Sequence, residues 1–269
     1  MKRISLVLAL LLYMMVPFSA HADLLVLVHG YMGSALSWEV SGINAMLEAS
    51  GWRRGGLPAG PQPIAGGSGD VRKISYAVEL PSLAPMLVQA DQLQLQLAQI
   101  SAMHPGERLI IAAHSAGGVV ARLVLVRGGA PGATALITVA SPHLGTLRAA
   151  QALDATDTPW PFCLVENFFS NGSYRAVKRS RGALMDLSPA YPGSLLYWLN
   201  GQPHPDIAYY SIVTPGPAGL GDELVPAFSQ DMNNLPALHG KSQLVAVAGG
   251  HSLNPQVGMA LTAILAHLE

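Results

Sequence analysis

Cysteine is nearly absent from this 269-residue chain, in which Cys163 is the only one. A single cysteine forms no internal disulfide, so the chain depends on a packed core for its stability. No elbow-like turn or basic neighbour surrounds Cys163, and we interpret it as a small buried hydrophobe, not as a nucleophile. Half of all residues are hydrophobic, which is enough to build the core of one large domain.

Charged residues are also scarce, at 12% of the chain, and the formal net charge is only −1 at pH 7. Proteins that bind nucleic acid carry a clear excess of Lys and Arg, so this composition excludes a nucleic-acid partner.

Long hydrophobic runs are missing as well. The run from Ile4 to Val16 falls short of the roughly 20 residues that a membrane-spanning helix needs. It follows two basic residues and precedes an Ala-His-Ala motif at 20–22. This arrangement predicts a secretory signal peptide over residues 1–22, with export to the periplasm or out of the cell and a mature chain that begins at Asp23.

What the chain does contain is a strand-to-helix turn centred on Ser115. Residues 109–113 form an apolar run, and apolar positions at helical spacing follow from Ala116 onward. Small residues flank the turn, Ala113 before the serine and Gly117 after it. This is the pattern of a nucleophile elbow, in the form A-x-S-x-G in place of G-x-S-x-G. The alternative is an ordinary turn with an incidental serine.

The order of the predicted elements favours one α/β domain over residues 23–269. Apolar runs at 24–31 and 135–140 are typical of strands buried on both faces, which implies a mostly parallel sheet with helices on either side. Because the mature chain begins directly with the first of these strands, we expect a reduced version of such a fold. Further strands are expected at 71–80, 207–213 and 243–248, helices at 37–50, 84–103 and 255–268, and a long surface loop at 52–70.

Residues 147–206, which we call the cap region, interrupt this alternation and contain eight aromatic residues. A long aromatic insertion after a strand's carboxyl end lies where α/β folds bind ligands, so it predicts a lid or cap. The alternative is a structural cover that makes no contact with a ligand. Within the cap region, residues 181–188 have the pattern of a short helix.

A serine hydroxyl is a weak nucleophile at neutral pH and needs a histidine base that a carboxylate orients. In a parallel sheet the carboxyl ends of the strands share one edge, so both partners are expected to follow a strand, as Ser115 does. Asp222 follows the expected strand 207–213, and His251 follows the expected strand 243–248 across a Gly-Gly turn. We therefore predict Ser115, Asp222 and His251 as nucleophile, acid and base.

Other residues fit these roles less well. Asp206 precedes its strand, and His114 adjoins Ser115 but is expected to point into the packing. His29 and His143 end strands and border this edge, and we interpret both as hydrogen-bonded structural histidines. The remaining candidates are Asp154, Asp157, Asp186 and His204 in the cap region, and Glu223 and Asp231 near Asp222.

Acyl transfer also needs donors for the oxyanion of the tetrahedral intermediate, and backbone N–H groups supply them. The N–H of Ala116 comes directly after the nucleophile at the start of a helix, where the helix dipole adds to it. The second predicted donor is the N–H of Tyr31, in the loop after the first strand.

Together these motifs resemble the bacterial lipase and esterase branch of the α/β-hydrolase superfamily. The resemblance rests on His29-Gly30-Tyr31-Met32-Gly33, residues 113–117, residues 141–146, Asp222 and His251, in the Ser, Asp, His order of that superfamily. It implies a reduced α/β-hydrolase fold that hydrolyses carboxylic esters through an acyl-enzyme.

The resemblance also implies oxyanion roles for Tyr31 and Ala116, and a lipid or other small ester as substrate, with transient contact with a lipid surface. Thioesterases, amidases and acyltransferases use the same three residues, so they stay open, as does a catalytically inactive binding protein on this fold. We predict neither a cofactor nor a metal ion.

Overall fold

The computed structural model describes residues 23–57, 70–155 and 173–269. The predicted signal peptide at 1–22 lies outside this part of the chain. Within it, no helix is both long enough and apolar enough to cross a bilayer.

Seven strands form one sheet in the order β2-β3-β1-β4-β5-β6-β7, and every neighbouring pair is parallel. The predicted fold class, a parallel sheet flanked by helices, is therefore confirmed. Parallel strands bring their carboxyl ends to one edge, where the loops that carry Ser115, Asp222 and His251 begin. The strands are β1 (Asp23–Val28), β2 (Trp52–Arg54), β3 (Asp70–Val78), β4 (Arg108–His114), β5 (Ala133–Val139), β6 (Ala208–Val213) and β7 (Ser242–Ala246).

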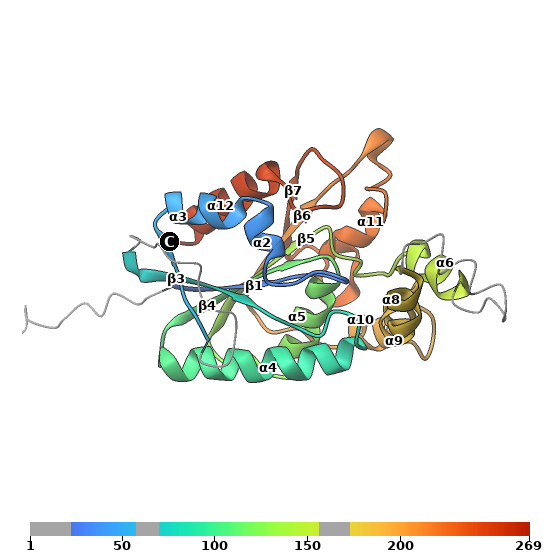
Figure 1. Cartoon of the computed structure of the whole chain (residues 1–269), viewed down its shortest axis with the longest axis horizontal. Coiled ribbons are helices and arrows are strands. Elements are labelled where there is room, and N and C mark those ends of the chain that lie inside the picture. The colour runs from blue at the N-terminus through green and yellow to red at the C-terminus, as the bar shows by residue number, and fades with distance from the viewer. Residues whose placement is uncertain (1–22, 58–69, 156–172) are drawn as a thin grey trace, which may run out of the picture.

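Helices cover both faces of the sheet (Figure 1). Helices α4 and α5 lie on one face, and α2, α3 and α12 lie on the other. Their bounds are α2 (Ser37–Val40), α3 (Ile43–Ala49), α4 (Met86–Met103), α5 (Ala116–Val126) and α12 (Pro255–Leu268).

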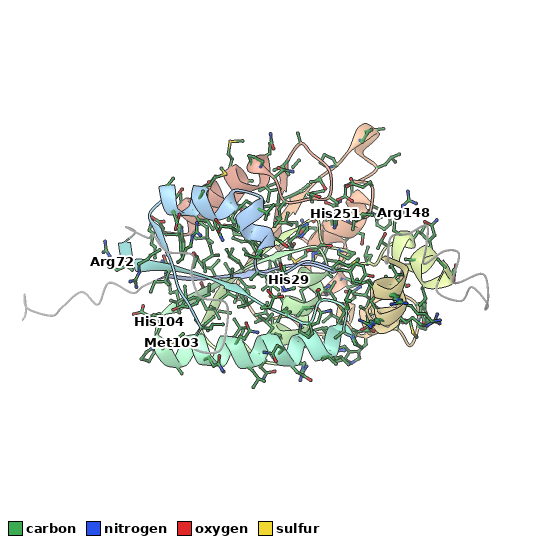
Figure 2. The ribbon with its side chains drawn as sticks, in the orientation of Figure 1. His29, Arg72, Met103, His104, Arg148 and His251 are labelled. Atoms are coloured by element: carbon green, nitrogen blue, oxygen red, sulfur yellow. The ribbon has the colours of Figure 1, made fainter. Side chains whose placement is uncertain are left out.

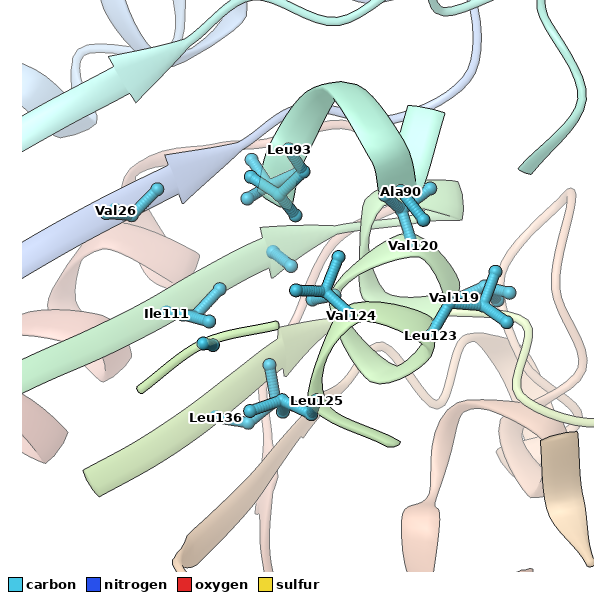
Figure 3. Packing of buried hydrophobic residues seen from close by; sticks show 14 of the residues in the cluster. Val26, Ala90, Leu93, Ile111, Val119, Val120, Leu123, Val124, Leu125 and Leu136 are labelled. Carbon is cyan, nitrogen blue, oxygen red and sulfur yellow. The ribbon is translucent and has the colours of Figure 1, made fainter. Parts of the chain in front are cut away.

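The core consists of one hydrophobic cluster on each face of the sheet. Along β4, Ile111 packs into the α4–α5 cluster, whereas the preceding residue, Ile110, packs into the α12 cluster. Successive strand residues point to opposite faces, so a strand buried on both faces is apolar at every position. Figure 3 shows Leu93 of α4 and Val124 of α5 packed on the same side as Ile111. Full burial of each such side chain is worth about 1.5–3 kcal/mol.

Two predicted elements differ from the observed ones. The helix expected at 37–50 is two helices, because Gly42 between them has a φ of 78°. The loop expected at 52–70 begins with the edge strand β2, whose buried Trp52 packs in the α12 cluster. The first difference is a local effect of this glycine, whereas the second comes from packing on the sheet, which overrides local composition. The last helix is observed at the predicted bounds, 255–268.

Helices make up most of the described part of the cap region, and Figure 1 shows α6, α8 and α9 grouped at one end of the molecule. The predicted helix at 181–188 corresponds to α9. Residues 156–172, which include Cys163, lie outside the described residues. The helices of the cap region are α6 (Leu147–Ala155), α8 (Ser173–Arg179), α9 (Arg181–Leu187) and α10 (Leu195–Asn200).

The connection between β6 and β7 carries Asp222 in an irregular loop. Its short helices are α11 (Ala227–Gln230) and the 3₁₀ turns η1 (Pro217–Gly219), η2 (Met232–Asn234) and η3 (Pro236–Leu238).

Candidate active site

Ser115 lies on a sharp turn between β4 and α5. It has φ 53° and ψ −128°, a conformation that few non-glycine residues adopt. Two glycines leave room for this turn, Gly117 in α5 and Gly30 in the loop after β1. A Cβ on Gly30 would lie 2.7 Å from Ser115 Cβ, and a Cβ on Gly117 would lie 2.4 Å from the carbonyl oxygen of His29. The structure therefore has the strained strand-turn-helix geometry of a nucleophile elbow, set against the loop after β1.

The imidazole of His251 lies between Ser115 and Asp222. Its Nε2 is 2.8 Å from Ser115 Oγ, and its Nδ1 is 3.0 Å from Asp222 Oδ2. With the proton on Nδ1, the ring donates to the carboxylate and accepts from the serine hydroxyl, which is the tautomer that a general base needs. The structure thus brings together the three side chains that the sequence placed at one edge of the sheet.

Asp222 has a fully buried side chain that accepts hydrogen bonds from five donors. Burial raises the pKa of this carboxyl, but the hydrogen bond and charge of His251, with two backbone N–H groups, outweigh burial and hold the pKa below its ordinary value. The carboxylate is therefore ionised at neutral pH although it is buried. Its donors are His251 Nδ1 (3.0 Å), Thr214 Oγ1 (2.8 Å) and Gln230 Nε2 (3.1 Å) on Oδ2, and the backbone N–H groups of Leu224 (2.8 Å) and Val225 (2.7 Å) on Oδ1.

Thr214 and Gln230 fix each other as well as the carboxylate. The backbone N–H of Thr214 donates to Gln230 Oε1 at 2.8 Å, and Gln230 Nε2 also donates to the Val225 carbonyl at 2.9 Å. The hydroxyl of Thr214 has one proton and two acceptors in reach, Asp222 Oδ2 at 2.8 Å and Gln230 Oε1 at 3.2 Å. The charged and nearer carboxylate takes that proton, because charge-assisted hydrogen bonds are stronger.

Two further contacts hold the main chain of His251. Its backbone N–H donates to both carboxylate oxygens of Glu223, each at 3.1 Å. Its carbonyl oxygen accepts from His114 Nε2 at 2.8 Å, and the two rings lie 5.2 Å apart. Burial, and after it the charge of His251, lowers the pKa of His114 to about 4, so His114 is neutral at pH 7 and donates from Nε2. The expectation that His114 points into the packing is wrong, because its side chain is only partly buried and lines a hollow at the surface. It is placed there by its hydrogen bond to the His251 carbonyl.

The backbone N–H groups of Tyr31 and Ala116 donate no hydrogen bond to any of the residues that the structure describes. Ala116 begins α5, so its N–H points out of the positive end of the helix dipole. Tyr31 follows Gly30, which lies against Ser115. Both N–H groups are thus unpaired next to the nucleophile, as donors to an oxyanion must be before substrate binds. The Tyr31 hydroxyl lies 2.6 Å from Ser180 Oγ of the cap region.

Thr214, Gln230 and the contact of Glu223 with His251 were not predicted from the sequence. Thr214 is the first residue after β6, at the same edge of the sheet as Ser115, where an uncharged threonine carries no signal of an acid or base. Nothing in the local pattern around Gln230 signals its role, because its partners depend on how the loop after β6 folds back.

Three of the other candidate residues make structural contacts, whereas Asp157 lies outside the described residues. His29 accepts from the N–H of Leu80 at 3.0 Å, and Asp186 accepts from the N–H of Met86 at 2.8 Å, at the start of α4. The Nε2 of His143 lies 3.2 Å from Thr138 Oγ1.

The loop that carries Asp222 is tied to the base of the cap region. Arg148 of α6 donates from Nε to the Glu223 carbonyl at 3.2 Å, and the hydroxyl of Thr146 donates to the Leu224 carbonyl. Figure 2 shows Arg148 beside the cap helices and His251 on the side of Arg148 that faces the middle of the molecule. Among the described residues, no three His, Cys, Asp or Glu side chains cluster as metal ligands do.

No family model matches the chain, and a search of curated proteins finds no relative. Solved structures are similar over nearly the whole length. A mature lipase of Bacillus licheniformis shares 15% identity at a TM-score of 0.61, covering 94% of this chain and 94% of its own. An esterase of Rhodococcus sp. shares 15% identity at a TM-score of 0.53, covering 92% of both chains.

A third similar structure is a thioesterase from the prodiginine pathway of Streptomyces coelicolor. It shares 17% identity at a TM-score of 0.52 and covers 93% of this chain and 86% of its own. At such identities the likeness shows the fold alone. The chain therefore has the α/β-hydrolase fold, as the resemblance implied.

Proposed function

We propose that this chain is an exported serine hydrolase that cleaves carboxylic esters through an acyl-enzyme. The observation that carries the proposal is the unbroken contact chain from Asp222 through His251 to Ser115, at 3.0 and 2.8 Å, on a strained elbow. The order and geometry of these groups match what acyl transfer from a serine requires.

In the first half of the reaction, Ser115 Oγ attacks the ester carbonyl while His251 Nε2 takes its proton. Ionised Asp222 stabilises the resulting imidazolium and keeps the ring in place. The N–H groups of Tyr31 and Ala116 donate to the negative oxygen of the tetrahedral intermediate. His251 then gives its proton to the departing alkoxide, and the acyl group stays on Ser115.

In the second half, water attacks the acyl-enzyme as His251 takes one of its protons, and the acid leaves when that proton passes to Ser115. The similar structures of a lipase, an esterase and a thioesterase support acyl transfer in general. Ester cleavage is favoured over the thioester, amide and transfer alternatives by the sequence motifs that resemble lipases and esterases.

The test is hydrolysis of p-nitrophenyl esters by the mature protein beside its Ser115→Ala variant. We expect kcat to fall by about 10⁴-fold or more in the variant, because removal of the nucleophile leaves only the binding and oxyanion contributions. Ser101→Ala, on the outer helix α4, is the matched control and should keep full activity. Equal rates for Ser115→Ala and wild type would disprove the proposal. If the folded wild type cleaves only thioesters or amides, the proposed substrate bond is wrong, but the proposed roles of Ser115, His251 and Asp222 are kept.

The export part of the proposal rests on the sequence of residues 1–22. It predicts that the protein recovered from the periplasm or the medium begins at Asp23, which N-terminal sequencing measures. Recovery of the intact chain from the cytoplasm alone would contradict it.

We further propose that the cap region borders the substrate site. The contact between Tyr31 and Ser180 supports this, since it joins the loop of the proposed oxyanion donor to the cap region. Transient contact with a lipid surface is also proposed, supported by the exposed apolar side chains of Leu220, Leu224 and Phe228 in the loop of Asp222.

A further inference from the structure

A hollow of about 430 Å³ lies between the loop after β1, helix α2 and the segment that follows His251. Small-molecule sites in proteins span roughly 300–1,000 Å³, so this hollow is large enough to hold part of a ligand. Its walls are formed by residues 30–34, 36, 37, 40, 41, 114, 252 and 253.

The walls of the hollow include direct neighbours of the proposed catalytic residues, although Ser115 and His251 themselves do not line it. Gly30 in its wall lies against the nucleophile, since a Cβ on Gly30 would be 3.3 Å from Ser115 Oγ. Tyr31, the proposed oxyanion donor, lines the same wall, and Ser252 directly follows the base in the chain. A group attached to a carbonyl carbon at Ser115 therefore reaches this hollow within a few bonds.

The chemistry of the lining is neutral and largely apolar at its rim. Of the described residues that line it, none is Asp, Glu, Lys or Arg. His114, in the same wall, has a pKa lowered to about 4 by burial and the charge of His251, so it is uncharged at pH 7. Met32, Leu36 and Val40 expose 51%, 59% and 87% of their surface. Neighbouring exposed apolar side chains typically mark a surface that a partner or ligand covers.

We propose that this hollow receives an uncharged hydrocarbon chain of the ester substrate. The inference rests on the proposed function, since it assigns a subsite of the same reaction. A charged headgroup here would lose its water without gaining an opposite charge, so the lining selects against it. The acyl side and the alcohol side of an ester can each supply the chain, and the experiment separates them.

The experiment uses two series of esters, one with acyl chains from acetyl to octanoyl on one alcohol, the other with acetates of alcohols from methyl to octyl. Each methylene buried in an apolar site strengthens binding by about fourfold, so kcat/KM should rise with chain length in the series whose chain fills the hollow. Val40→Asp places a carboxylate at the rim, and Leu36→Asp is the second variant. We expect each to lower the ratio of kcat/KM for the longest over the shortest ester by about tenfold or more in that series.

The matched control is Leu95→Asp, on the outer side of α4, where the leucine is 61% exposed. It makes the same chemical change away from the hollow and should leave the ratio at the wild-type value. If this ratio falls in the acyl series, the hollow holds the acyl chain of the ester. If it falls in the alcohol series, the hollow holds the alcohol chain. An unchanged ratio in both series for both variants overturns the inference, provided that the wild type hydrolyses the short esters. A folded wild type that hydrolyses no ester in either series tells against the proposed function itself, which separates the two failures.

Discussion

Two buried charged side chains, Asp222 and Arg122, are treated very differently in this fold. Asp222 receives five donors, one of them the ring of His251, and its pKa is held below the ordinary value. Arg122, on α5, is also fully buried, but no carboxylate among the described residues lies within 4 Å of its guanidinium. Burial lowers the pKa of Arg122 to about 9.

The partners of Arg122 are neutral groups of other elements. Its Nη2 donates to Asn200 Oδ1 of α10 at 2.9 Å, and its Nε donates to His204 Nε2 at 3.1 Å. Asn200 in turn donates to the His143 carbonyl at 3.0 Å. Arg122 therefore joins α5 to the end of the cap region, whereas the donors of Asp222 keep a negative charge beside the base. The contrast is what we expect if the Asp222 site serves the proposed chemistry and Arg122 serves structure.

The largest expected effect comes from removing the charge of Asp222. In Asp222→Asn we expect kcat for a p-nitrophenyl ester to fall by about 10³- to 10⁴-fold, because a neutral amide neither stabilises the imidazolium nor selects the right tautomer. Rate and melting temperature measured on the same preparation separate catalysis from folding. A loss of less than tenfold in a folded variant would show that Asp222 is not the acid.

Arg122→Met should do the reverse, with a large effect on stability and a small one on rate. It leaves the acceptors on buried Asn200 and partly buried His204 without their donor, which costs about 1–3 kcal/mol, or roughly 3–10 °C in melting temperature for a chain of this size. Thermal unfolding measures the loss, and kcat/KM should stay within about threefold of wild type. Arg127→Met, at the exposed end of the same helix, is the control and should cost less than about 1 kcal/mol. If the two variants have the same melting temperature, Arg122 does not stabilise the fold in the way described.

Thr214→Val sharpens the comparison, because it removes one donor from the carboxylate at nearly constant shape. With one donor fewer, the ionised form of Asp222 is less stabilised, so the pKa of this carboxyl rises and the acidic limb of kcat/KM moves to higher pH. We expect kcat/KM at pH 7 to fall about five- to tenfold. Thr214→Ser keeps the hydroxyl and should restore the wild-type profile. A limb that does not move in Thr214→Val would leave Thr214 with a packing role only.

The smallest expected effect is on how the stability of the folded chain changes as the pH falls, which differs between the Arg122 site and the Asp222 site. Burial, and after it the charge of Arg122, lowers the pKa of His204 to about 4. The unfolded chain therefore binds more protons at this residue than the folded one, and stability falls as the pH drops from about 6.5 towards 4. Asp222, with its lowered pKa, stays ionised over that range.

His204→Asn should consequently show a shallower fall in melting temperature over this pH range than wild type. Because His204 is partly exposed, the difference in slope should be well below the limit of about 1.4 kcal/mol per pH unit for one proton. Identical slopes would mean that other groups cause the acid sensitivity.

Much of the framework was predictable from local pattern. The apolar run before Ser115 and the small residues around it predict a strand, a sharp turn and a helix, all of which the structure contains. The rule that parallel strands share a carboxyl edge was enough to choose Asp222 and His251 from many acidic residues and histidines. Strands and buried helices can be predicted from the periodicity of apolar residues, because the side that each residue faces follows from its position in the local element.

Only the tertiary structure decided the surroundings of these side chains. Several features join segments that no local sequence pattern connects. They are the hydrogen bonds from Thr214 and Gln230 to Asp222, the hydrogen bond from the His251 N–H to Glu223, and the hollow beside Gly30. The sequence by itself determined which residues stand at the active edge, since this depends on the order of strands. Their charge, orientation and neighbouring space depend on how distant loops pack together, and that is settled by the free energy of the whole fold.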